Sequence, residues 1–370
     1  MSPSDRNPGA QTVTEEAVLT ALQTVQDPSA GKDIVSLGLV HGMTIDGGNV
    51  SFTLQFTTQP ALAKAQIHSQ AKKVVTGVPG VSNVQAVMGG QAQAGRAAPA
   101  AAEPPREELI PEVKHTIAVS SGKGGVGKST VAVNLALGLH ETGARVGLVD
   151  VDVYGPDIPM MMGARGKPGM FENRIIPVES YGIKLISIGF FVAPGEAIVW
   201  RGPMIHSAVQ QFLRDVLWGE LDYLVFDMPP GTGDAQLSLS QVIPLGGVVM
   251  VTTPQDVALL DVRKALAMFK KLNVPILGVV ENMSDFACPH CGGRTPIFGE
   301  GGGNKIAAEV GVPLLAQIPI DPETRKGGDE GQPILIRRPD SPQAATFRKL
   351  AAAVADRVST FSVLKLPSIS

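Results

Sequence analysis

A glycine-rich run at residues 122–130 has the residue types needed to bind phosphate. It matches the pattern G-x-x-x-x-G-K-[ST] and lies between the strand-like segment TIAVSS and a segment with helical periodicity. Glycines allow backbone N–H groups to curl around phosphate oxygens, and the start of the following helix adds a favourable dipole. Lys128 can reach the β- and γ-phosphates, while Ser129 can hold Mg²⁺. The predicted nucleotide-binding residues are Gly122, Lys123, Gly124, Gly125, Val126, Gly127, Lys128, Ser129 and Thr130.

Two other strand-like segments end in carboxylates. RVGLVD ends at Asp150 and is followed by Asp152, and YLVFD ends at Asp227. Carboxylates at the C-terminal ends of parallel strands stand in the crevice where open α/β sheets bind ligands, and Mg²⁺ favours such oxygen ligands. A capping or turn role is the alternative for each of them, most of all for Asp150.

The two cysteines of the chain lie in the motif Cys288-Pro289-His290-Cys291, which favours a metal or redox role in a reducing compartment. The motif follows Asn282 and precedes GGRTPIFGEGGG, so we expect an exposed loop there and not the strand-to-helix context of a catalytic dithiol. A [4Fe–4S] cluster or a Cys₄ zinc site needs about four thiolates, so one chain supplies half a site and a symmetric dimer a whole one. His290 is expected to be a bystander, because its position beside Cys291 would strain a single tetrahedron.

The elements that position these residues fall into two parts, as expected for 370 residues. Residues 10–89 predict a small α+β domain, with a helix over 12–25 that starts at a Thr12–Glu15 capping box, a hairpin over 33–56, a helix after Pro60 and a strand at 84–88. The Ala/Pro-rich residues 90–111 predict a linker. Over 112–362, near-continuous apolar strands alternate with helices, which predicts a doubly wound α/β domain with a mostly parallel sheet.

Charge and hydropathy exclude several classes of protein. Lysine and arginine total 31 against 34 acidic residues, and this net charge of -3 gives no case for binding nucleic acid or an anionic membrane. No segment resembles a signal peptide or a spanning helix, so we expect a soluble, cytoplasmic protein. An apolar stripe near residue 350 is expected to pack on the sheet, because Asp356 interrupts the basic face that a membrane-surface helix would show. The stripe comprises Phe347, Leu350, Ala351, Val354 and Val358.

The loop GKGGVGKST resembles that of the deviant Walker A ATPases, the class of MinD, ArsA and the nitrogenase iron protein. The resemblance implies that Lys123 crosses the interface of a nucleotide-sandwich dimer; a solvated lysine is the alternative. It also implies that Asp227 is the Walker B carboxylate, that Asp152 positions the attacking water, and that MPPGTGD at 228–234 is a second switch. Adenine recognition is assigned by resemblance to Asn282, for which a turn-forming asparagine is the competing interpretation.

Taken in order, GKGGVGKST, DVDVYGPDIP, FDMPPGTGD, VENMS and CPHC resemble the Mrp/ApbC family of iron–sulfur cluster carrier ATPases over the whole C-terminal domain. The resemblance implies a homodimer that binds and slowly hydrolyses ATP with Mg²⁺. It also implies that Cys288 and Cys291 of both chains hold a bridging [4Fe–4S] cluster, which is passed to apo iron–sulfur proteins with the help of cluster assembly factors.

The N-terminal domain, with DIVSLGLV and Thr57-Thr58, resembles a small iron–sulfur assembly domain. The cysteine that many such domains carry after the threonine pair is missing from QPALA, which removes the case for cluster ligation there. Two other functions stay open. One is a MinD-like positioning or partition ATPase without a cluster, and the other is an electron-transfer ATPase.

Overall fold

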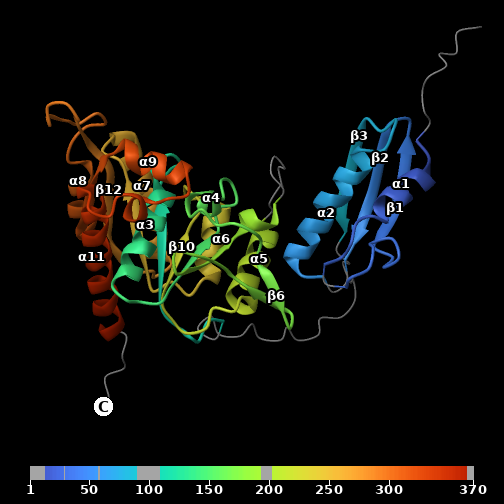
Figure 1. Ribbon diagram of the computed structural model, residues 1–370, viewed down its shortest axis with the longest axis horizontal. Helices are drawn as coiled ribbons and strands as arrows, with labels where there is room; N and C mark the ends of the chain where they lie inside the picture. The colour runs from blue at the N-terminus through green and yellow to red at the C-terminus, as the bar shows by residue number, and fades with distance from the viewer. Residues whose placement is uncertain (1–12, 29, 57–58, 90–108, 193–201, 365–370) are drawn as a thin grey trace, which may run out of the picture. The chain divides into compact units, whose positions relative to one another are not determined.

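The computed structural model describes residues 13–28, 30–56, 59–89, 109–192 and 202–364. The chain divides into two compact units, one N-terminal and one C-terminal (Figure 1). Thr12, Thr57, Thr58 and nearly all of the expected linker at 90–111 lie outside the described residues.

The N-terminal unit packs two helices on a three-stranded sheet in the order β1-β2-β3. β1 and β2 are antiparallel, with Asp46 opposite Asn49 at the predicted turn, and β3 pairs with β2 in parallel. Alternation along β2 places Phe52 and Leu54 in the core. The elements are α1 (Glu15–Leu22), β1 (Val40–Asp46), β2 (Asn49–Gln55), α2 (Ala61–Thr76) and β3 (Asn83–Gly89).

The first helix and the first strand of this unit begin later than predicted, and the helix ends at Leu22 instead of residue 25. The N-cap of α1 is Thr14, whose hydroxyl accepts a hydrogen bond from the N–H of Ala17, so the helix begins two residues later than a cap at Thr12 predicts. The first strand begins at Val40, because an oxygen of Asp33 accepts hydrogen bonds from the N–H groups of Val35 and Ser36 and so holds the chain in a turn.

The C-terminal unit is built on a nine-stranded sheet in the order β13-β12-β11-β4-β10-β5-β9-β8, with β14 also paired to β12. All pairings except those of β8 and β13 are parallel, which confirms the predicted fold class. The strands are β4 (Val113–Ser121), β5 (Val146–Asp150), β8 (Val178–Ser180), β9 (Ile183–Ser187), β10 (Leu221–Asp227), β11 (Gly247–Thr252), β12 (Ile276–Ala287), β13 (Arg294–Thr295) and β14 (Leu314–Ile320), beside a separate hairpin of β6 (Gly169–Phe171) and β7 (Arg174–Ile176).

Helices cover both faces of this sheet (Figure 1). α3 packs against β4, β5 and β10, while α5 packs on α6 and α7 on α8. The helices are α3 (Lys128–Glu141), α4 (Ile158–Met161), α5 (Gly202–Asp215), α6 (Asp234–Val242), α7 (Asp256–Lys271), α8 (Gly302–Val310), α9 (Pro322–Asp329), α10 (Ile334–Arg337) and α11 (Pro342–Leu364), with a 3-10 helix at Ile188–Phe191.

The apolar stripe of α11 is buried inside this unit, as expected. Its five members are at most 3% exposed, and α11 packs along α3. The two helices approach closely at Gly138, where a Cβ would lie 2.9 Å from the Cβ of Ala351. The stripe is therefore not available to bind a membrane, and none of the described helices has the length and apolar character to cross one.

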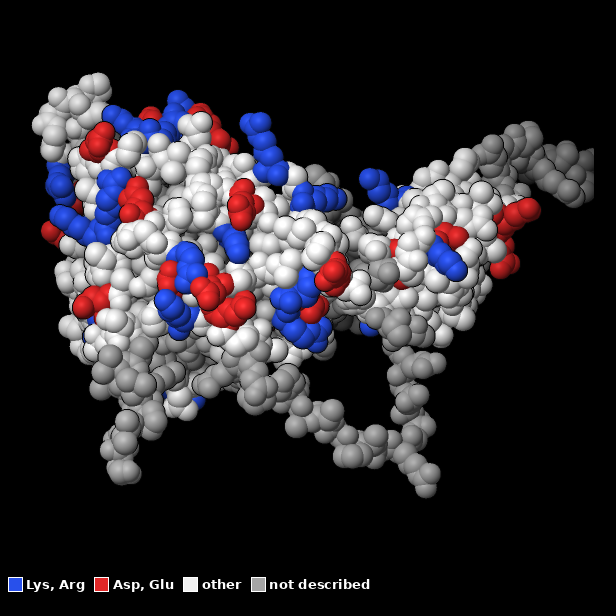
Figure 2. Space-filling view, turned by 60° about the horizontal axis from the view of Figure 1, so that its bottom comes forward, with Lys and Arg blue, Asp and Glu red and all other residues white. Residues whose placement is uncertain are grey.

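Charges of both signs are interspersed on the face of the molecule shown in Figure 2. Several form surface ion pairs, such as Arg145 with Glu220 at 2.6 Å and Arg348 with Glu141 at 2.6 Å. Such a surface agrees with the nearly balanced charge of the sequence.

Candidate functional site

The phosphate loop lies between the end of β4 and the start of α3, as the sequence predicts. Gly125 and Gly127 have φ angles of +79° and +81°, a conformation that side chains with a Cβ rarely adopt. A Cβ at Gly127 would also lie 2.2 Å from the amide nitrogen of Asn282. Glycine is therefore required at 127 both by the backbone conformation and by a neighbour from β12.

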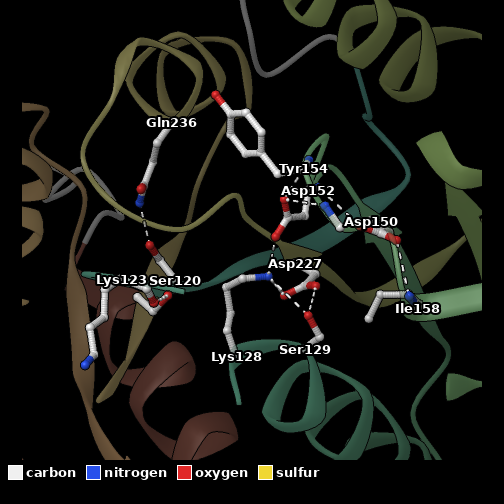
Figure 3. Close-up of polar contacts among 12 residues, drawn as sticks. Ser120, Lys123, Lys128, Ser129, Asp150, Asp152, Tyr154, Ile158, Asp227 and Gln236 are labelled. Carbon is white, nitrogen blue, oxygen red and sulfur yellow. Dashed lines mark hydrogen bonds and ion pairs between the residues drawn. The ribbon is translucent and has the colours of Figure 1, made fainter. Parts of the chain in front are cut away.

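Lys128, Ser129, Asp152 and Asp227 converge at the C-terminal edge of the sheet (Figure 3). The ammonium of Lys128 lies 2.6 Å from one oxygen of Asp227 and 3.4 Å from Asp152. The hydroxyl of Ser129 donates a 2.7 Å hydrogen bond to the other oxygen of Asp227. Three separate segments of the chain thus bring one ammonium, one hydroxyl and two carboxylates together.

The Lys128–Asp227 pair is buried, with Lys128 only 7% exposed and Asp227 fully covered. Burial by itself lowers the pKa of Lys128, but the attraction of Asp227 and then Asp152 raises it overall, so the ammonium keeps its charge. Burial raises the pKa of Asp227, and the lysine opposes that shift. The charged form of the buried Asp227 is therefore stabilised by Lys128.

Asp150 takes the turn role that the sequence left open. Its buried carboxylate accepts hydrogen bonds from the hydroxyl of Ser187 at 2.8 Å and from the N–H groups of Asp152 and Ile158. Burial raises the pKa of Asp150 well above its usual value, and the charge of Asp227 adds to the effect. Asp150 therefore shapes the loop that presents Asp152.

Asp152 has two separate contacts. One oxygen accepts hydrogen bonds from the N–H groups of Tyr154 and Gly155, and the other faces Lys128. This arrangement holds the Asp152 carboxylate beside Lys128, and its role in positioning the attacking water stays a prediction.

Lys123 points away from the Lys128 cluster (Figure 3). Its carbonyl oxygen accepts a hydrogen bond from the hydroxyl of Ser121, which fixes the backbone at the start of the loop. The side chain is half-buried. The orientation suits a lysine that acts outside its own phosphate loop, and that role stays a prediction.

Asn282 lies inside β12, so the alternative of a turn-forming asparagine is wrong. Its buried amide donates a 2.9 Å hydrogen bond to the carbonyl oxygen of Val126 in the phosphate loop. Sequence analysis missed this contact, because it joins residues 156 positions apart. Adenine recognition by Asn282 stays a prediction.

Gln236 is a second residue that sequence analysis missed. It is buried on α6, directly after the segment 228–234, and its amide contacts the hydroxyl of Ser120 at 2.5 Å (Figure 3). This contact ties the end of the predicted second switch to β4. Its only sequence signal is a glutamine in the first turn after FDMPPGTGD.

The cysteines lie at the tip of the β12–β13 hairpin, on an exposed loop as predicted. The hairpin closes through hydrogen bonds from the N–H of Cys288 to the carbonyl of Gly293 and from the N–H of Gly292 to the carbonyl of Cys288. Both thiols are free; Cys288 is half-buried and Cys291 exposed.

Backbone N–H groups of His290 and Cys291 point at the sulfur of Cys288 and lower the pKa of its thiol. The turn therefore favours the thiolate, which is the form that binds metal. Among the described residues, no group of three or more His, Cys, Asp or Glu side chains could hold a metal ion. Each chain thus presents two thiols on this hairpin, and their role as metal ligands stays a prediction.

Known families and proteins match both units of this chain. Residues 112–355 match the family described as NUBPL iron-transfer P-loop NTPase, and residues 15–86 match the family described as iron-sulfur cluster assembly protein. An iron-sulfur cluster carrier protein of Synechocystis is 45% identical over 359 residues, which cover 94% of this chain and 98% of that protein. The iron-sulfur cluster transfer protein NUBPL of Mus musculus is 49% identical over 69% of this chain and 81% of its own length.

Among solved structures, a nucleotide-binding protein from Archaeoglobus fulgidus in complex with ADP has a TM-score of 0.58 and 38% identity, covering 65% of this chain and 95% of that one. These matches confirm the resemblance drawn from the motifs. By its sequence over both units, and by the phosphate loop and cysteine hairpin of its fold, the chain belongs to the family of iron–sulfur cluster carrier proteins, which are P-loop NTPases.

Proposed function

We propose that this protein is a homodimeric ATPase that holds a [4Fe–4S] cluster between Cys288 and Cys291 of two chains and transfers it to apo iron–sulfur proteins. The observation that carries the proposal is the exposed hairpin, which orients two thiols, one of them made acidic by backbone N–H groups. Two thiolates are half of what a cluster needs, and a two-fold axis supplies the other half. The carrier names of the relatives support iron–sulfur cargo over zinc.

The phosphate site supports binding of ATP with Mg²⁺. The hydroxyl of Ser129 and the carboxylate of Asp227 are oxygen donors in contact with each other, which is the chemistry that Mg²⁺ favours. Bound there, Mg²⁺ would supply charge neutralisation to the phosphates. Lys128 would exchange Asp227 for phosphate oxygens, and Asp152 would orient the attacking water.

Slow hydrolysis is part of the proposal, with Lys123 of one chain acting at the nucleotide of its partner. A positioning ATPase without a cluster is disfavoured, because the stripe of α11 is buried against α3 and the relatives are named as carriers. The domain limits 10–89, 90–111 and 112–362, the cytoplasmic location, and the role of cluster assembly factors as partners belong to the same proposal.

Anaerobic reconstitution with iron and sulfide, followed by metal analysis and analytical ultracentrifugation, tests the proposal. About four irons should bind per two chains, in a dimer with broad visible absorption that bleaches in air. Cys288→Ser and Cys291→Ser should each abolish the absorption, whereas the matched control His290→Ala should keep it. Zinc retained in place of iron, or one full cluster for each monomer, would contradict the bridging arrangement.

A further inference from the structure

A single strand, β12, contains contacts to both the phosphate loop and the cysteine hairpin. Asn282 donates to the carbonyl of Val126, and Cys288 follows the end of the same strand. The intervening Asp285 pairs with Arg294 of β13 at 3.2 Å, which holds the two arms of the hairpin together. Asn282 and Cys288 are therefore only six residues apart in the sequence.

Glu281, next to Asn282, anchors the other end of the cysteine segment. Its buried carboxylate accepts hydrogen bonds from the N–H of Gly303, in the first turn of α8, and from the amide of Gln317 at 2.7 Å. A Cβ at Gly303 would lie 2.6 Å from the Cβ of Glu281, so this approach requires glycine. The segment that begins at Cys288, just after β12, is thus hydrogen-bonded back to β12 where Gly303 contacts Glu281.

Met283 lies between these anchors in an unfavourable backbone conformation. Its φ angle is +56°, which is uncommon for a residue that is not glycine, asparagine or aspartate. The pairing of β12 with β14 loses its register between Asn282 and Phe286, so the strand is irregular at this point. The Met283 side chain reaches to 3.9 Å from the position of a Cβ on Gly127, the residue that caps α3. Backbone strain that the surroundings maintain is characteristic of functional sites.

We infer that Glu281 and Met283 are positioning residues, which couple the conformation of the phosphate loop to that of the cysteine hairpin. The inference rests on the proposed function, because a carrier that uses ATP must bind its cargo with different affinity with and without bound nucleotide. Movement of the loop around a nucleotide displaces Met283 and Asn282 together. Glu281, on the same backbone, carries that displacement to both ends of the cysteine segment.

The chain offers a direct probe, because Cys288 and Cys291 are its only cysteines. Reduced, cluster-free full-length protein is treated with iodoacetamide, and the alkylation of each cysteine is followed by peptide mass with no nucleotide, with Mg-ADP, or with a non-hydrolysable ATP analogue. The rate of alkylation should change about fivefold or more on saturation with nucleotide, the usual scale of coupling between two sites. In Met283→Gly the change should fall below about twofold, although nucleotide still binds.

Two controls separate coupling from general loosening. Asn273→Gly relieves the same φ of +56° in the loop between α7 and β12 and should keep the full nucleotide response. Met283→Leu restores a side chain of similar size and should recover the response. Glu281→Gln replaces one of the two accepting oxygens by an amide nitrogen, so the side chain can no longer accept from both Gly303 and Gln317. This variant should lower the response with Met283 unchanged.

An unchanged nucleotide response in both Met283→Gly and Glu281→Gln would overturn the inference, as would a wild-type protein whose thiols ignore bound nucleotide. A response lost equally in Asn273→Gly would also overturn it. The alkylation assay contains no iron, so a negative result in it would not contradict cluster binding. In the same way, failure of the iron reconstitution would not change the meaning of the alkylation result.

Discussion

Replacement of Lys128 by alanine should abolish ATP hydrolysis and also destabilise the nucleotide domain. The residue is proposed to face phosphate, and in the structure its ammonium lies 2.6 Å from the fully buried Asp227. Removing one member of a buried ion pair leaves an uncompensated charge, which costs about 3–5 kcal/mol. For a domain of this size the melting temperature should fall by about 6–20 °C.

The loss of stability in Lys128→Ala should depend on pH in a defined direction. Burial already raises the pKa of Asp227, and removal of the lysine removes the main opposing influence. A carboxyl group with a raised pKa in the folded state favours folding below its unfolded pKa of about 3.9, and this contribution is lost as pH rises through the folded pKa. The variant should therefore lose less stability at about pH 5 than at about pH 7.

Urea denaturation at both pH values, with ATP turnover measured in parallel, tests this reasoning. The double variant Lys128→Ala/Asp227→Asn is the matched control, because it removes the buried charge and should recover much of the stability without recovering hydrolysis. A Lys128→Ala protein as stable as wild type at both pH values would show that the pair is not buried in solution. Unchanged turnover would refute the assignment of Lys128 to phosphate.

Three other outcomes follow from the structure. Lys123→Ala should bind ATP but fail to hydrolyse it, and mixing it with Lys128→Ala chains should restore at most one active site per heterodimer; full activity of Lys123→Ala alone would mean that the lysine is merely solvated. Gly127→Ala should weaken nucleotide binding and should destabilise the domain by more than the roughly 1–2 kcal/mol that a left-handed backbone costs a residue with a Cβ. The control Gly143→Ala has a φ of +89° and open space around it, so in the same denaturation assay it should cost only that amount. Deletion of residues 1–108 should leave ATPase activity and iron binding in place but slow transfer to an acceptor apoprotein, and loss of bound iron on truncation would contradict this role.

The sequence was sufficient for features that depend on local pattern. The phosphate loop, the parallel sheet and the exposed cysteine loop are each encoded in contiguous residues, and the structure contains all three. The burial of α11 was predicted because its apolar residues recur at helical spacing with no matching basic face.

The features that could not be predicted depend on contacts between distant segments. Nothing local to Asn282 indicates that its amide reaches Val126, and nothing local to Glu281 indicates that its carboxylate accepts from the N–H of Gly303 in α8. The predicted N-cap of the first helix was wrong because two nearby threonines, Thr12 and Thr14, both have a hydroxyl of the type that caps helices. The structure uses Thr14. The carboxylate of Asp33 accepts a hydrogen bond from the backbone N–H of Ser36, and the resulting turn moves the start of the strand to Val40. The alternation of apolar residues does not predict this turn.

The packing of α11 on α3 has a consequence for the order of events during synthesis. α3 begins at the phosphate loop, yet it is braced by Gly138 against Ala351 and by an ion pair between Glu141 and Arg348, residues 207 positions apart. The ribosome therefore exposes the apolar side of α3 long before its partner helix emerges, whereas the N-terminal unit can already have folded. A nascent chain arrested before α11 should be prone to aggregate and should gain nucleotide affinity only when translation passes that helix.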